Sequence, residues 1–207
     1  MVRKPQVCLL AVVLLIGLCG CSTSVPDAQV TNEKIANSMT EVLENSLNVL
    51  NPSEVEREAI ERAITVGHID PADYEAAHLR YVQCMNQQGF WPEFREATYG
   101  VYIELPYAYS GDQNELDQAH SECSQDNAVL ASLYLMQQAN PDLWADPQLV
   151  AVQCLRKGSF VDVDYTVEDF AQDWAKSKFP FDRYADGPND CLYGAGYGYA
   201  FFSASGQ

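Results

Sequence analysis

Residues 81–90, YVQCMNQQGF, share the order Val-Gln-Cys followed by Phe with residues 151–160, AVQCLRKGSF. In both segments the phenylalanine follows the cysteine at the same distance, and the next cysteine downstream, Cys123 or Cys191, follows at a similar distance. We interpret the two segments as equivalent helices of a duplicated unit of about 70 residues. Chance similarity between two buried helices is the alternative.

The amino-terminal residues have the layout of a removable export signal. Arg3 and Lys4 form a short basic head, and residues 7–18 form an apolar run. A membrane-spanning helix needs about 20 apolar residues, so this run is too short to be one. The sequence therefore predicts that residues 1–20 are a signal peptide and that the rest of the chain is exported.

Leu18-Cys19-Gly20-Cys21 ends this signal and resembles the lipobox of bacterial lipoproteins. In that family the last cysteine, here Cys21, carries a diacylglycerol thioether and becomes the new amino terminus. The resemblance implies a protein anchored by lipid on the extracytoplasmic face of the cell membrane, because several acyl chains on one residue give stable attachment. Residues 21–31 are expected to be a flexible tether. The alternatives are an ordinary secretory signal, with Cys21 incidental, and an uncleaved anchor.

Four cysteines remain in the exported part of the chain: Cys84, Cys123, Cys154 and Cys191. An even number of cysteines in an exported chain predicts disulfides. The duplication favours one disulfide within each unit, Cys84–Cys123 and Cys154–Cys191, over the other pairings. A zinc site made by the same four sulfurs is the alternative, but the sequence has no Cys-x-x-Cys pair.

The exported part of the chain is strongly acidic. The whole chain has 12 basic and 29 acidic residues, and the signal contains two of the basic ones, so the rest carries a formal charge of −19. Nucleic-acid binding needs clustered Lys and Arg, and the sequence has no basic stripe. We therefore expect no nucleic-acid partner, and membrane contact through the N-terminal lipid alone.

Residues 32–207 are expected to form a single, mainly α-helical domain with at most a small β-sheet, and an α+β fold is the alternative. Its expected parts are N-terminal helices in 32–67, one pseudo-repeat at about 70–140 and a second at about 146–207. Apolar spacing, caps and breakers predict helices at 31–50, 51–67, 70–89, 112–139 and 146–158, and another after 166. Short strands are expected within 99–105 and 160–165, whereas 193–202 is ambiguous.

Residues 67–89, GHIDPADYEAAHLRYVQCMNQQG, contain the order G-x-I, Y-x-x-A, Y-x-x-C-M and G. This order resembles a recurrent pattern of actinobacterial cell-surface lipoproteins of uncharacterised function. The resemblance covers only these residues, and the second cysteine segment lacks the Met and the Gly at the same offset. It implies an envelope location and a disulfide-linked helical module, and it assigns no active-site residue.

The sequence contains no recognisable catalytic signature, so we expect no catalytic residue, no metal and no cofactor. His120 and Cys123 have the spacing of a Cys–His pair, but Cys123 should be oxidised. Asp162 and Asp164, with Glu168 and Asp169, resemble half of a calcium loop, and helix capping explains them better. An envelope hydrolase would have to use Asp162, Asp164 and Glu104 as its carboxylates.

The sequence therefore favours a non-enzymatic interaction or accessory module of the cell envelope, whose partner is another envelope protein. The alternative is a lipoprotein that binds a small ligand or a glycan in an aromatic groove, because aromatic rings offer an apolar face with a polar tip. The candidate groove residues are Trp91, Tyr99, Tyr102, Tyr107 and Tyr109.

The lipobox predicts the mass of the mature protein. After extraction from native membranes, the intact chain should begin at Cys21 and carry the added mass of the lipid. Mass spectrometry measures this directly. A free amino terminus at an unlipidated Cys21, or retention of Met1, would contradict the prediction.

Overall fold

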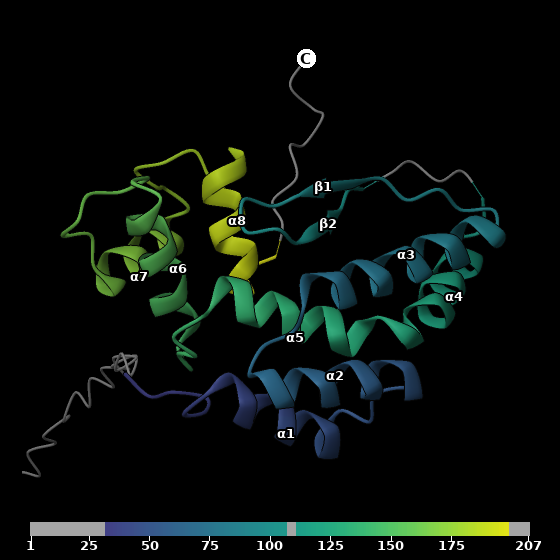
Figure 1. Ribbon diagram of the computed structural model, residues 1–207. Helices are drawn as coiled ribbons and strands as arrows, with labels where there is room; N and C mark the ends of the chain where they lie inside the picture. The colour runs from purple at the N-terminus through teal and green to yellow at the C-terminus, as the bar shows by residue number, and fades with distance from the viewer. Residues whose placement is uncertain (1–31, 107–110, 199–207) are drawn as a thin grey trace, which may run out of the picture.

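The computed structural model describes residues 32–106 and 111–198, and within these ranges the fold is mainly helical (Figure 1). Cys21, Tyr107 and Tyr109 lie outside the described residues. The elements are α1 Met39–Val49, α2 Glu54–Val66, α3 Pro71–Gln87, β1 Phe94–Glu96, β2 Tyr102–Glu104, α4 Gln113–Cys123, the 3₁₀ helix η1 Ser124–Asp126, α5 Ala128–Ala139, α6 Pro147–Lys157, α7 Val167–Lys176 and α8 Asp186–Gly194. The expected fold class is confirmed.

Side-chain caps explain where several helices begin. Asp70 and Asp146 cap α3 and α6, each followed by a proline at the first helical position, as the sequence predicts. Thr166 forms the predicted capping box of α7. The predicted start of α2 is wrong by two residues: Ser53, not Asn51, is the cap, because its hydroxyl and the Glu56 carboxylate form a reciprocal capping box.

The single helix expected over 112–139 is instead α4, η1 and α5. The buried Glu56 Oε1 accepts hydrogen bonds from Val129 N–H at 2.8 Å and Leu130 N–H at 3.1 Å. These are orphan donors of a helix start, so Glu56 stabilises a new N-terminus at α5. The strand expected within 160–165 is also absent, and β2 pairs with β1 in an antiparallel hairpin.

The two cysteine helices end in the same way. Phe90 N–H donates to the Met85 carbonyl at 2.9 Å, and Phe160 N–H donates to the Leu155 carbonyl at 3.0 Å. The residue before each phenylalanine is left-handed, Gly89 at φ +88° and Ser159 at +58°. Ser159 is therefore the structural equivalent of Gly89.

Gly158 is required for a different reason from Gly89. A Cβ atom added at Gly158 would overlap the ring of Phe160. The glycine is thus a site of close approach, whereas Gly89 provides the left-handed turn.

The described residues form two disulfides, Cys84–Cys123 between α3 and α4 and Cys154–Cys191 between α6 and α8. These are the pairs that the duplication predicts. Disulfides of this kind indicate an oxidising, extracytoplasmic compartment. The likeness between the two units stops there, because the first contains the β-hairpin between its cysteines and the second contains α7.

Within the part of the chain that the structure describes, the buried apolar residues form three clusters. One joins α1, α2, α5 and the start of α3, a second joins α6, α7 and α8, and a third surrounds the Cys84–Cys123 disulfide. Figure 1 shows α6–α8 on one side of the molecule, α1–α5 on the other, and the hairpin lying over α3 and reaching α8.

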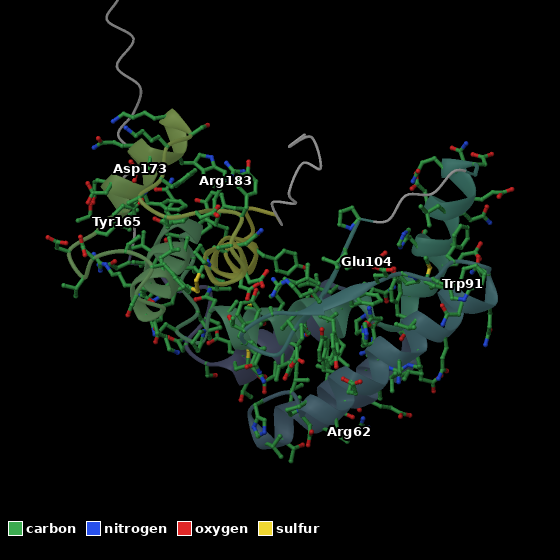
Figure 2. The ribbon with its side chains drawn as sticks, turned by 90° about the horizontal axis from the view of Figure 1, so that it is seen from above. Arg62, Trp91, Glu104, Tyr165, Asp173 and Arg183 are labelled. Atoms are coloured by element: carbon green, nitrogen blue, oxygen red, sulfur yellow. A yellow bond between two sulfur atoms is a disulfide. The ribbon has the colours of Figure 1, made fainter. Side chains whose placement is uncertain are left out.

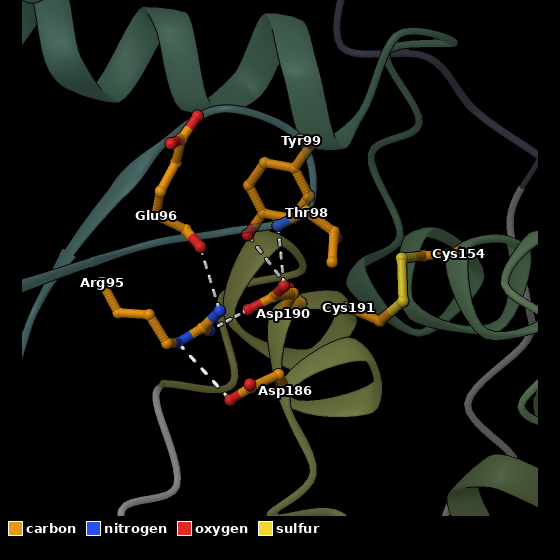
Figure 3. Close-up of polar contacts among 8 residues, drawn as sticks. All are labelled: Arg95, Glu96, Thr98, Tyr99, Cys154, Asp186, Asp190 and Cys191. Atoms are coloured by element: carbon orange, nitrogen blue, oxygen red, sulfur yellow. Dashed lines mark hydrogen bonds and ion pairs between the residues drawn. A yellow bond between two sulfur atoms is a disulfide. The ribbon is translucent and has the colours of Figure 1, made fainter.

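The hairpin is attached to α8 by a buried ion pair between Arg95 on β1 and Asp190 (Figure 3). The Asp190 side chain has no solvent exposure, and its carboxylate also accepts Thr98 N–H at 2.8 Å. Tyr99 adds a hydrogen bond from its hydroxyl to the Asp190 carbonyl at 3.0 Å. Two strands of three residues are too short to be stable alone, so α8 holds the hairpin in place.

Removing the Asp190 charge should therefore destabilise the fold. Asp190→Asn leaves Arg95 without its buried partner, and the free energy of unfolding in urea should fall by about 3 kcal/mol. Asp186→Asn is the matched control, because Asp186 lies on the same helix, 3.6 Å from the same arginine, but is 69 % exposed. That variant should lose less than about 0.5 kcal/mol. Equal losses in the two variants would contradict the assignment.

Candidate functional site

Two cavities lined by the described residues are candidates for a binding site. The larger, about 400 Å³, lies beside the Cys154–Cys191 disulfide, where Tyr99, Gln138 and Gln153 contribute to its lining. The smaller, about 310 Å³, lies between the hairpin, α3, the α4–α5 region and the end of α8. We call it the tyrosine–histidine cavity, and its lining residues are Tyr74, His78, Tyr81, Phe94, Tyr102, Glu104, His120, Ser124, Asn127, Ala131 and Tyr193.

Regular spacing brings the lining residues of α3 together. Tyr74, His78 and Tyr81 follow one another at intervals of four and three residues, so they share one face of the helix. On the hairpin, Tyr102 and Glu104 are two residues apart and point to the same side of β2. Phe94 is paired with Glu104 and lies on that side too.

A hydrogen-bonded chain joins three elements at the cavity wall. The Tyr81 hydroxyl donates to Glu104 Oε2 at 2.7 Å and lies 2.7 Å from His120 Nδ1. A carboxylate only accepts, so the single phenolic proton points to Glu104 and His120 donates from Nδ1. His120 Nε2 is 3.7 Å from Glu104 Oε1, too far for a hydrogen bond. The chain orients Glu104 within the cavity wall.

Ring contacts give the cavity an aromatic wall. His78 stacks on Tyr102 with a centroid separation of 4.1 Å and meets the edge of Phe94 at 4.5 Å. Burial lowers the pKa of His78, so the neutral imidazole is favoured in this stack. Burial also raises the pKa of Tyr74 to about 12. His78 and Tyr74 therefore contribute neutral rings to the wall.

The charge of the lining comes from Glu104. None of the described residues that line the cavity is a lysine or an arginine. Close by, the Tyr102 hydroxyl donates to Glu75 Oε2 at 2.9 Å. The described lining thus contains one carboxylate, which lies 3.7 Å from the imidazole of His120.

Of the five aromatic residues expected to form one groove, the three that the structure describes do not share one cavity. Tyr102 lines the tyrosine–histidine cavity, and Tyr99 lines the larger cavity. Trp91 is 70 % exposed, and Figure 2 shows it at the far end of the molecule from Tyr165. Tyr107 and Tyr109 lie outside the described residues. The cavity draws most of its rings from α3 and α8 instead.

The structure also places the carboxylates that the sequence offered as a calcium loop or a hydrolase site. Asp162 and Asp164 lie exposed in the loop between α6 and α7. Tyr165, at the end of this loop, lies on the opposite side of the molecule from Glu104 (Figure 2). Asp162 and Asp164 therefore do not form a carboxylate site with Glu104. Asp169 belongs to the capping box of α7, as the capping explanation requires.

The disulfides exclude two further candidates. Cys123 is bonded to Cys84, so it is not a thiolate partner of His120, and the four bonded sulfurs are not zinc ligands. Within residues 32–106 and 111–198, no group of three or more His, Cys, Asp or Glu side chains is arranged to hold a metal ion.

No protein-family model, curated protein or solved structure matches this chain. Among the described helices, none is both long and apolar enough to cross a membrane.

The depressed pKa of His78 predicts a pH-dependent stability. The unfolded chain binds a proton near the ordinary histidine value of 6.5, before the folded chain does. Stability is therefore full above that pH and falls as the pH drops from about 7 to about 5. His78→Phe keeps a ring in the stack but does not titrate, so its urea unfolding free energy should fall less over this range.

The exposed His68 provides the control for this pH dependence. His68→Phe should keep the slope of the parent protein, because the side chain is outside the stack. A slope unchanged in the His78→Phe variant would contradict the role assigned to burial.

Proposed function

We propose that this chain is a non-enzymatic, extracytoplasmic protein that binds a small ligand in the tyrosine–histidine cavity. The observation that carries the proposal is the chain from His120 through Tyr81 to Glu104, which fixes polar atoms in a cavity walled by aromatic rings. Ligand sites are usually concave and largely apolar, with a few oriented polar groups. This cavity is concave, and it combines aromatic rings with oriented polar groups.

The hydroxyl and imidazole groups of the cavity favour binding over nucleophilic catalysis. Ser124, the one aliphatic hydroxyl in the lining, donates its proton to the backbone carbonyl of His120 at 2.6 Å. Its proton is therefore not directed to an imidazole nitrogen, as an activated serine requires. The His120 Nδ1 proton is directed to Tyr81.

The location belongs to the same proposal. The two disulfides support the extracytoplasmic side, and the lipobox at Leu18-Cys19-Gly20-Cys21 supports attachment to the cell membrane through lipid on Cys21. A tethered binding protein would hold its ligand near the membrane surface.

A partner from the envelope remains a prediction of the sequence. The most exposed large apolar side chains among the described residues are distributed over different elements: Val163, Val49, Trp91 and Val66. They do not single out one docking surface, whereas the cavity is a defined site. We therefore place ligand binding first.

The three histidines provide a test of the binding site by NMR. His78 and His120 line the cavity, and His68 is exposed outside it. A panel of neutral sugars, small organic anions and small organic cations should contain a compound that shifts the imidazole C–H resonances of the first two at millimolar concentration. The resonances of His68 should stay in place as the internal control. If no class shifts His78 and His120, or if all three histidines shift together, the proposed site is wrong.

A further inference from the structure

We propose that the ligand of the tyrosine–histidine cavity is a small organic cation, a protonated or quaternary amine. This inference rests on the proposed function and adds the chemical class of the ligand. It follows from two features of the lining: its aromatic rings and its one carboxylate, that of Glu104.

The aromatic rings suit a cation. A positive charge is attracted to the negative face of an aromatic ring, and the attraction is stronger in a site withdrawn from water. Tyr74, Tyr81, Tyr102, Phe94 and Tyr193 bring five rings to one cavity from α3, the hairpin and α8.

Two of these rings are further polarised. Tyr81 donates its hydroxyl to Glu104, and Tyr102 donates its hydroxyl to Glu75. A phenol that donates to a carboxylate has a more negative oxygen and a more electron-rich ring, so both tyrosines become better partners for a cation.

The negative charge of Glu104 also favours a cationic ligand. Glu104 lies in the wall, where its Oε2 accepts from the Tyr81 hydroxyl and its Oε1 lies 3.7 Å from His120 Nε2, beyond hydrogen-bond distance but within ion-pair distance. An anionic ligand would meet Glu104 with no lysine or arginine in the lining to offset it. The whole chain has a net charge of −17, which attracts cations over a longer range.

A matched pair of probes isolates the charge. Choline and 3,3-dimethyl-1-butanol have nearly the same shape, but the second has a neutral carbon in place of the ammonium nitrogen. Titration followed by the His78 and His120 resonances should show choline binding at least about tenfold more tightly than the alcohol.

Variants test the carboxylate. Glu104→Gln keeps an acceptor for the Tyr81 hydroxyl but removes the charge, so choline affinity should fall at least about tenfold while affinity for the alcohol changes little. Glu93→Gln is the matched control, because Glu93 precedes the same hairpin, is exposed and does not line the cavity. It should bind choline as the parent protein does.

The outcomes separate the two proposals. If the alcohol or another neutral or anionic probe binds in the cavity as tightly as choline, the cation is the wrong class but the binding site stands. If no probe shifts His78 and His120, the binding site itself is wrong. If Glu104→Gln fails to fold, the comparison of the two probes in the parent protein decides the proposal alone.

Discussion

The buried ion pair between Arg95 and Asp190 is the constraint on which the arrangement of the molecule depends. It fixes a hairpin of two three-residue strands to α8, and neither strand is long enough to hold its place alone. Asp190 precedes Cys191, whose disulfide fixes α8 to α6. The disulfide therefore holds α8 against α6, and the ion pair holds the hairpin against α8. The hairpin in turn forms one wall of the tyrosine–histidine cavity.

The Cys84–Cys123 disulfide positions the opposite wall of the cavity, which α3 and α4 form. Tyr81 and His120 each lie three residues before a cysteine of the Cys84–Cys123 pair, so the bond sets α3 and α4 at a register in which the Tyr81 hydroxyl reaches His120. Glu104 arrives from the hairpin and completes the chain. The two sulfur bridges thus stabilise the fold and, at the same time, position the polar groups of the site.

Much of the fold could be predicted from local sequence. The cysteine spacing gives the disulfide pairs, and the Asp-Pro caps give the starts of α3 and α6 because a cap needs only its neighbours. The break between α4 and α5 could not be predicted in this way. It depends on Glu56, which belongs to a helix far away in the sequence and caps α5 from the side.

The site was harder to predict because its members come from distant segments. An aromatic-rich stretch between Trp91 and Tyr109 suggested a groove, but alternation along β2 directs Tyr102 and Glu104 to one side and Ile103 to the other. The helical spacing of Tyr74, His78 and Tyr81 marks an aromatic face in the sequence. What local pattern cannot show is that Glu104 and His120 meet this face.

In the proposed complex a cation lies over the tyrosine rings beside Glu104. A crystal structure with tetramethylarsonium would reveal it, because the anomalous scattering of arsenic locates the ion without ambiguity. An arsenic peak is expected in the tyrosine–histidine cavity, within about 6 Å of ring centroids. A peak only in the cavity beside the Cys154–Cys191 disulfide, or no peak in a crystal that leaves the site accessible, would contradict cation binding in the tyrosine–histidine cavity.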